Sequence, residues 1–154
     1  MVGNGCLAPR PNSNCSWISG DAVFLTRASR YDAEHPDSLN DKKNWEFYCG
    51  KGGGSASEPV HSTASTECWT ANVEEAKPIF TWKGRVGTVT ATWHPARKLY
   101  LFAVTTPTVL PSTVGPYDTY VLEAPALTGP FKLVSYMPKF GQQAVSGDLF
   151  ADAS

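Results

Sequence analysis

The chain has 154 residues, of which 42% are hydrophobic and 18% charged, and its formal net charge is −1. This length and composition are typical of one globular domain with a hydrophobic core. The near-zero charge gives no electrostatic reason to expect a nucleic acid or an anionic membrane as partner. No stretch is apolar enough for a membrane span, and Met1–Gly5 lacks the basic start and apolar centre of a secretory signal.

The first half of the chain is predicted to contain strands separated by polar loops. Residues 1–20 are rich in Pro, Asn, Ser and Gly, which predicts a loop-like N-terminal segment. Ala22–Arg27 is a strand candidate, and Asn44–Cys49 alternates large and polar residues like a half-buried strand. Val73–Lys77 is predicted to form at most one helical turn, and Pro78–Trp82 to be extended.

Four cysteines, Cys6, Cys15, Cys49 and Cys68, lack the close spacing of a zinc site, so no structural metal is expected. A disulfide between Cys49 and Cys68 would close the Gly/Ser-rich segment between them, and Cys6 with Cys15 would close a smaller loop. Four reduced thiols remain an equal alternative, because sequence alone does not give connectivity. A disulfide pair would favour a secreted origin.

The second half is predicted to form four consecutive antiparallel strands. Thr88–His94 and Leu99–Thr105 are joined by the turn at residues 95–98, and Thr119–Ala124 and Phe131–Tyr136 by a Pro/Gly-rich connection. Such a unit is one blade of a β-propeller or one sheet of a sandwich. The fold class is therefore all-β.

A weak internal repeat supports the blade interpretation. Asp21–Ala28 aligns with Asp118–Ala124, and each is followed by a second strand with an aromatic-rich end, Trp45–Phe47 and Phe131–Leu133. Two copies of an outer hairpin predict the back half of one blade followed by a complete one. A chance match of two apolar strands is the alternative.

Several of these segments resemble secreted β-propeller proteins of the arabinanase-like and xylosidase-like glycoside hydrolases and related hydrolase-like propellers. The resemblance rests on Ala22–Arg27, Asn44–Gly50, Arg85–Thr90 and Lys98–Leu101, and on an outer hairpin with the pattern Leu122-Glu123-Ala124 followed by Leu127–Phe131. It implies a partial β-propeller over residues 21–143, with about one and a half to two four-stranded antiparallel blades, and an irregular tail over residues 144–154. Propellers of that kind have about five blades, so the chain is expected to be a fragment of an extracellular parent protein.

Glycoside hydrolysis needs two carboxyl groups, which in such propellers project from inner strands. The inner-strand segment Thr88–His94 contains neither Asp nor Glu, so no catalytic pair is identified. Asp21 and Asp118 open strands and are interpreted as turn-capping residues. Arg85 could hydrogen-bond sugar hydroxyls and Trp82 could stack on a sugar ring. The alternatives are a surface Arg bonded to a loop carbonyl and a Trp packed between blades.

The sequence thus predicts a fragment of a secreted carbohydrate-active propeller protein, inactive by itself, with a polysaccharide or oligosaccharide as the ligand of the intact form. The alternative is a non-catalytic β domain that binds a glycan or a protein partner. Open sheet edges also predict self-association. No motif indicates a nucleotide, flavin or metal cofactor.

Overall fold

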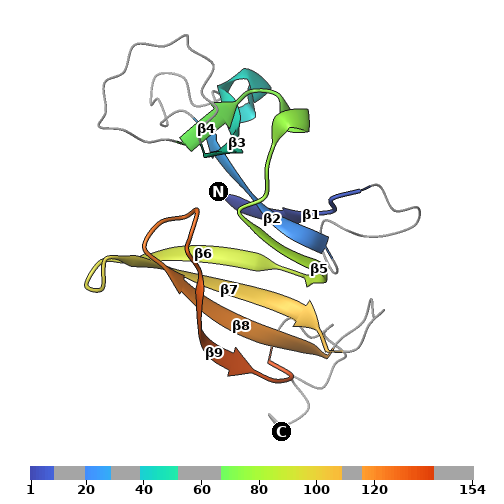
Figure 1. Ribbon diagram of the computed structural model, residues 1–154, viewed down its shortest axis with the longest axis vertical. Coiled ribbons are helices and arrows are strands. Elements are labelled where there is room, and N and C mark those ends of the chain that lie inside the picture. The colour runs from blue at the N-terminus through green and yellow to red at the C-terminus, as the bar shows by residue number, and fades with distance from the viewer. Residues whose placement is uncertain (9–19, 29–38, 52–66, 109–115, 141–154) are drawn as a thin grey trace, which may run out of the picture.

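The computed structural model describes residues 1–8, 20–28, 39–51, 67–108 and 116–140, and in this part the protein is all-β, with two antiparallel sheets and two 3₁₀ turns (Figure 1). The expected tail over residues 144–154 lies outside the described residues. The elements of the first sheet and its connections are β1 (Val2–Gly5), β2 (Gly20–Ala28), η2 (Lys42–Asn44), β3 (Trp45–Lys51), β4 (Glu67–Thr70), η3 (Val73–Glu75) and β5 (Phe80–Val86). The second sheet consists of β6 (Val89–His94), β7 (Leu99–Pro107), β8 (Tyr117–Ala124) and β9 (Lys132–Met137).

The second sheet confirms the predicted run of four strands. Its order is β6-β7-β8-β9, with every neighbour antiparallel. β7 begins with a continuous apolar run, and its Phe102 and Val104, two residues apart, share the buried face. In the turn between β6 and β7, Lys98 has a φ of 52°, and in the connection between β8 and β9, Gly129 has a φ of 93°. Turn chemistry and strand periodicity therefore agree throughout this unit.

The first sheet is built around β2. Its order is β1-β2-β3-β4, and β5 also pairs with β2. The first half of β2 pairs with β5, from Gly20 to Val23, whereas Thr26–Ala28 pairs with β3. The predicted strands Ala22–Arg27 and Asn44–Cys49 are both present, and the predicted helical turn at residues 73–77 is the 3₁₀ turn η3.

The expectation that residues 1–20 form only a loop is wrong for Val2–Gly5. This segment is β1, which pairs antiparallel with β2 from Val2 opposite Leu25 to Gly5 opposite Ala22. Gly and Asn have low strand propensity, so the local sequence gives no strand signal. The strand forms because β2 offers an edge whose backbone groups need partners, and Val2 packs against the core.

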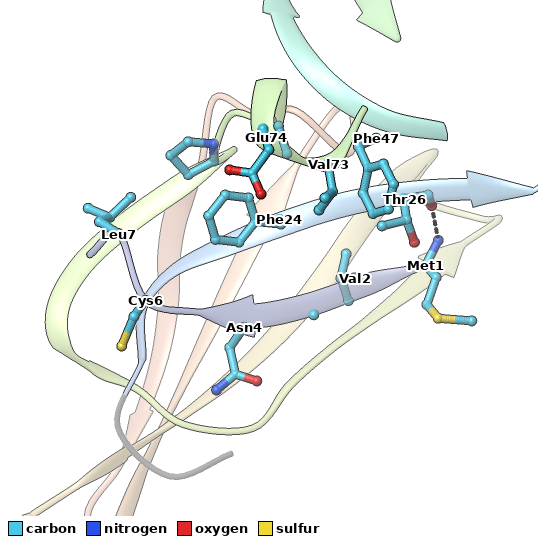
Figure 2. Close-up of a pocket in the computed structure, with 13 residues that line it drawn as sticks. Met1, Val2, Asn4, Cys6, Leu7, Phe24, Thr26, Phe47, Val73 and Glu74 are labelled. Carbon is cyan, nitrogen blue, oxygen red and sulfur yellow. Dashed lines mark hydrogen bonds between the residues drawn. The ribbon is translucent and has the colours of Figure 1, made fainter. Parts of the chain in front are cut away.

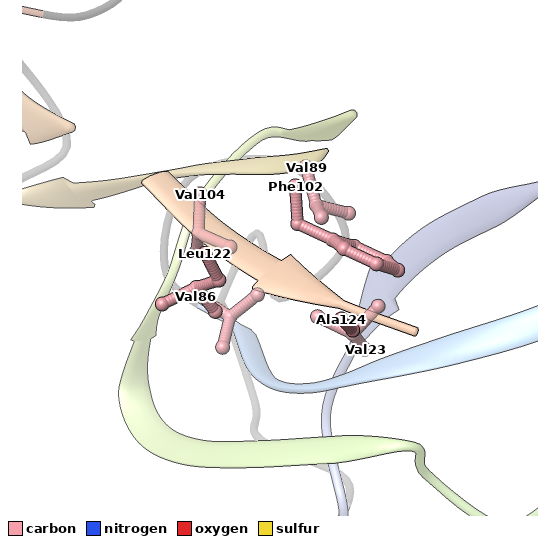
Figure 3. Packing of buried hydrophobic residues seen from close by; sticks show 7 residues of the cluster. All are labelled: Val23, Val86, Val89, Phe102, Val104, Leu122 and Ala124. Atoms are coloured by element: carbon pink, nitrogen blue, oxygen red, sulfur yellow. The ribbon is translucent and has the colours of Figure 1, made fainter. Parts of the chain in front are cut away.

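One hydrophobic core joins the two sheets. The buried cluster draws on β2, β5, β6, β7 and β8, and consists of Val23, Val86, Val89, Phe102, Val104, Leu122 and Ala124 (Figure 3). Phe131 packs edge-on against Phe102 and Phe80, with ring centroids 5.0 and 5.9 Å apart. Strands β1 and β6, the first strands of the two four-stranded runs, also lie against each other. The two sheets therefore form a single packed body.

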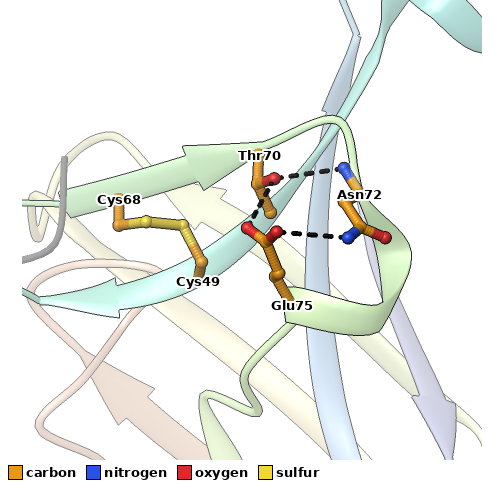
Figure 4. Close-up of a disulfide and its surroundings, with 5 residues drawn as sticks. All are labelled: Cys49, Cys68, Thr70, Asn72 and Glu75. Carbon is orange, nitrogen blue, oxygen red and sulfur yellow. Dashed lines mark hydrogen bonds between the residues drawn. A yellow bond between two sulfur atoms is a disulfide. The ribbon is translucent and has the colours of Figure 1, made fainter. Parts of the chain in front are cut away.

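The structure contains a disulfide between Cys49 on β3 and Cys68 on β4, with their Cα atoms 5.0 Å apart (Figure 4). Beyond β4, the turn into η3 is held by Glu75, which accepts hydrogen bonds from the Thr70 hydroxyl and the Asn72 amide, each 3.1 Å long. Cys6 is also disulfide-bonded, and its partner lies outside the described residues. The short strand β4 is thus covalently attached to β3.

Candidate functional site

The two residues proposed from the sequence as sugar contacts, Trp82 and Arg85, lie close together on β5. The Arg85 guanidinium carbon is 5.9 Å from the centroid of the Trp82 ring, at the outer limit of a cation–π contact. Trp82 packs edge-on against Tyr120 of β8, with a centroid distance of 4.9 Å and an interplanar angle of 85°. Trp82 is partly buried and packs against the core cluster, so it joins the two sheets as well as bordering their surface.

Tyr120 continues this aromatic row onto the edge strand. Tyr120 and Tyr136 are register partners on β8 and β9, and their ring centroids are 4.8 Å apart with an angle of 36° between planes. Tyr136 is 49% exposed and therefore presents its ring to solvent. We call Trp82, Arg85, Tyr120 and Tyr136 the aromatic surface.

A buried carboxylate, Asp118, accepts a hydrogen bond from one residue of the aromatic surface, Tyr136. Asp118, which is 6% exposed, accepts hydrogen bonds from the Lys139 backbone N–H at 2.8 Å, the Thr108 hydroxyl at 3.0 Å and the Tyr136 hydroxyl at 3.1 Å. The bond to Tyr136 fixes the direction in which that ring projects.

Burial of Asp118 opposes its ionisation, but the three hydrogen bonds and the charge of Arg85 outweigh this effect and lower the pKa of the carboxyl below its ordinary value. Asp118 is therefore ionised at neutral pH. Asp21 is likewise buried and accepts hydrogen bonds from the backbone of Gly84 and Leu7, at 2.8 and 3.3 Å. Both carboxylates hold backbone segments in place, but these segments lie 14 to 63 residues away rather than in the turns that the two residues were expected to cap.

Two further carboxylates form ion pairs with basic side chains. Glu46 pairs with Arg27 at 2.6 Å, and Glu123 pairs with Arg97 and Lys132 at 3.2 and 3.4 Å. β6, the expected inner strand, has no acidic residue. Within the described residues there is also no cluster of three or more His, Cys, Asp or Glu side chains suited to a metal ion.

A separate groove runs along β1, with a volume of about 600 Å³ (Figure 2). Its walls are largely apolar and include Val2, Phe24, Phe47 and Val73, and among the described residues that line it Glu74 is the one acidic side chain. A single carboxylate in an open groove does not form the acid and base pair that glycoside hydrolysis requires. The described lining of the groove therefore lacks the pair of carboxyl groups needed for glycoside hydrolysis.

Sequence reasoning found Trp82 and Arg85 but missed Tyr120 and Tyr136 as their neighbours. Each tyrosine lies in a strand that was predicted correctly, but neither the register between β8 and β9 nor the packing of β5 against β8 was predicted. Asp118 and Tyr120 are two residues apart and therefore lie on the same face of β8. This spacing is the one signal in the sequence that could have placed Tyr120 near Asp118.

No known protein family, curated protein or solved structure matches the chain. No helix in the part of the chain that the structure describes is long and apolar enough to cross a membrane.

Proposed function

We propose that the two sheets are neighbouring blades of a carbohydrate-active β-propeller protein and that the aromatic surface binds a glycan without cleaving it. Each sheet contains a run of four consecutive antiparallel strands, β1–β4 and β6–β9. The first strands of the two runs lie against each other, which is the relation expected of innermost strands in adjacent blades. The arrangement supports two blades, the upper end of the one and a half to two that were expected.

The aromatic surface is the observation on which glycan binding rests. A sugar ring has an apolar face that stacks on an aromatic ring, while its hydroxyls need hydrogen-bond partners. The half-exposed Tyr136 ring offers the stacking face, and its orientation is set by Asp118. Arg85 offers guanidinium donors to hydroxyl groups. These features suit a neutral oligosaccharide.

The protonation state of the nearby carboxylate supports binding without cleavage. One of the two catalytic groups must be protonated at the working pH, which requires a raised pKa. Asp118, the carboxylate closest to the aromatic surface, has a lowered pKa and donates no proton at neutral pH. If the intact protein cleaves glycans, its catalytic pair belongs to other blades.

The disulfide-bonded cysteines support a secreted protein, because disulfides persist in oxidising compartments. A secreted protein would also encounter polysaccharide ligands outside the cell. This part of the proposal is tested by expressing the chain with and without a secretory leader and titrating free thiols in each product.

The test of glycan binding is titration of the purified chain against a panel of neutral plant and microbial oligosaccharides by calorimetry. For the best ligand, Tyr136→Ala and Arg85→Gln are expected to weaken binding at least tenfold. Trp82→Ala is a less specific probe, because this side chain also packs between the sheets. Trp93→Ala, which changes an exposed ring at the opposite end of the second sheet, is the matched control and should leave affinity unchanged.

Absence of binding to every member of the panel, or equal binding by the Tyr136 and control variants, would reject the glycan assignment. Turnover of aryl glycosides or arabinan by the purified chain would reject the claim that it does not cleave. Thermal melting of each variant shows whether its fold is retained.

One observation favours a protein partner as a second candidate function. Edge strand β9 exposes Leu133, Val134 and Tyr136, and an exposed apolar edge strand can add a strand from another chain. A second copy pairing antiparallel through β9 would place Lys132 opposite Met137 rather than opposite another lysine. Sedimentation velocity at several concentrations tests this self-association, and Val134→Lys should abolish it.

A further inference from the structure

The apolar groove along β1 adjoins a second pocket, which lies beside η2. The two pockets have volumes of about 600 and 610 Å³ and share two lining residues, Phe47 of β3 and Val73 of η3. Phe24, Val73 and Phe47 follow one another along the groove (Figure 2). The described lining of the second pocket also includes Asn40, Lys42, Lys43, Trp45 and Ala71. We call the two adjoining pockets the extended groove.

Two aromatic rings of β3 form part of the wall of the extended groove. Trp45 and Phe47 are two residues apart on this strand, so they lie on the same face of it, and both are half-buried. The Trp45 indole N–H donates a hydrogen bond of 2.8 Å to the Leu39 carbonyl, which fixes the ring. Val73, which lines both pockets, is 57% exposed. The apolar wall is therefore accessible to a ligand from solvent.

The pocket beside η2 is positively charged. Lys42 and Lys43 both line it and are exposed, and its described lining includes no acidic residue. Within the described part of the chain, neither ammonium group has an ion-pair or hydrogen-bond partner. Asp41 is engaged with the backbone, since it accepts a hydrogen bond of 3.0 Å from the Lys43 N–H. Two lysine charges therefore border an apolar surface.

The charges along the extended groove favour one orientation of a ligand. Glu74 lines the groove along β1 but not the pocket beside η2, whereas Lys42 and Lys43 line the pocket and not the groove. A negative group is therefore attracted to the lysines and repelled by Glu74. An apolar tail attached to that group would reach the groove through Phe47 and Val73, which the two pockets share.

We propose that the extended groove binds a free aliphatic carboxylate, such as a medium-chain fatty acid. The acyl chain packs against Phe24, Phe47 and Val73, and the carboxylate accepts hydrogen bonds from Lys42 and Lys43. A nucleic acid would use the lysines but gain nothing from the apolar groove, so the combination favours an anionic amphiphile. The extended groove shares no residue with the aromatic surface, and the inference is independent of glycan binding.

The experiment is a titration of the full chain with sodium decanoate below its micelle concentration, followed by calorimetry and tryptophan fluorescence. We expect saturable binding at constant ionic strength. Decan-1-ol, which lacks the charge, and butyrate, which lacks most of the chain, should each bind at least tenfold more weakly.

Substitutions test the two parts of the site separately. Lys42→Gln and Lys43→Gln should each weaken decanoate binding at least threefold, and the double variant at least tenfold. Lys83→Gln, which changes an exposed lysine of β5 outside both described linings, is the matched control and should have no effect. Val73→Asp should abolish binding and Val73→Leu should retain it. Tyr136→Ala should leave decanoate binding unchanged.

Equal affinity for decanoate and decan-1-ol, or no saturable binding of decanoate, would overturn the proposal. Unchanged affinity in the double lysine variant, with a melting curve that shows it to be folded, would also overturn it. Decyltrimethylammonium that binds as tightly as decanoate would show that the groove takes amphiphiles of either charge, against the proposal. Vesicles containing phosphatidylglycerol form a last arm: binding of vesicles without binding of decanoate would assign the lysines to a membrane surface instead.

Discussion

Asp21 and Asp118 have similar hydrogen-bonding roles in the two sheets. Each stands near the start of an internal strand, and each accepts a hydrogen bond of 2.8 Å from a backbone N–H, of Gly84 in one case and Lys139 in the other. Gly84 belongs to β5, which pairs with β2, and Lys139 follows β9, which pairs with β8. A buried carboxylate thus ties the beginning of a strand to its neighbour twice in the chain.

Replacing Asp118 with Asn should destabilise the protein by about 2 kcal/mol at pH 7, because three hydrogen bonds lose their ionised acceptor. The pKa of Asp118 is lowered by folding, so its stabilising effect is complete above the unfolded value near 4 and is lost as pH falls through the lower folded value. The deficit of the variant should therefore be constant from pH 7 to 5 and shrink below about pH 4. Urea unfolding across this range measures it.

Glu74→Gln is the control for this experiment, since Glu74 is exposed and should show no such deficit. A deficit for Asp118→Asn that stays unchanged down to pH 2 would contradict the assignment of Asp118 as an ionised, hydrogen-bonded group.

The Cys49–Cys68 disulfide closes a loop across a sequence separation of 19 residues. The double variant Cys49→Ser, Cys68→Ser should lose about 3 kcal/mol of stability, by the loop-entropy relation. Replacement isolates this bond, whereas a reductant would also act on the disulfide of Cys6. Equal unfolding midpoints in urea for the variant and the natural chain would show that β4 is held by other contacts.

Phe102 and Phe140 form a matched pair for testing the core. Phe102 is 2% exposed at the centre of the cluster between the sheets, whereas Phe140 is 63% exposed. Phe102→Ala should cost about 3–5 kcal/mol through lost burial and a cavity, and Phe140→Ala should change stability by less than about 0.5 kcal/mol. Similar effects of the two changes in thermal or urea unfolding would refute the shared core.

Gly129 should not tolerate a side chain. Its φ is 93°, and a Cβ there would lie 3.2 Å from the ring of Phe131. Gly129→Ala is expected to cost about 1–2 kcal/mol from the left-handed backbone conformation alone. At Gly3 a Cβ would meet nothing within 4 Å, so Gly3→Ala should be neutral or slightly stabilising. Unfolding free energies of the two variants give the comparison.

The second sheet was predictable because its information is local. Alternation along β6, the apolar run of β7, the turn at residues 95–98 and the Pro/Gly-rich connection before β9 each specify an element from its own residues. Antiparallel strands joined by short connections then pair with their neighbours in sequence, so local signals suffice to place Trp93 opposite Tyr100.

The aromatic surface could be predicted only in part. Trp82 and Arg85 have side chains whose chemistry is visible in the sequence, but Tyr120 and Tyr136 become their neighbours through strand register and the packing of one sheet on the other.

By itself, then, the amino-acid sequence determined that the protein is all-β, where most of its strands lie, and that its expected inner strand has no catalytic acid. The tertiary structure decided that Val2–Gly5 is a strand, that β2 pairs with three other strands, and which aromatic rings meet. The physical reason is the distance in sequence over which each interaction acts. Periodicity and turn propensity act over a few residues, whereas β1 and the aromatic clusters depend on backbone edges and ring faces contributed by segments far apart in the chain.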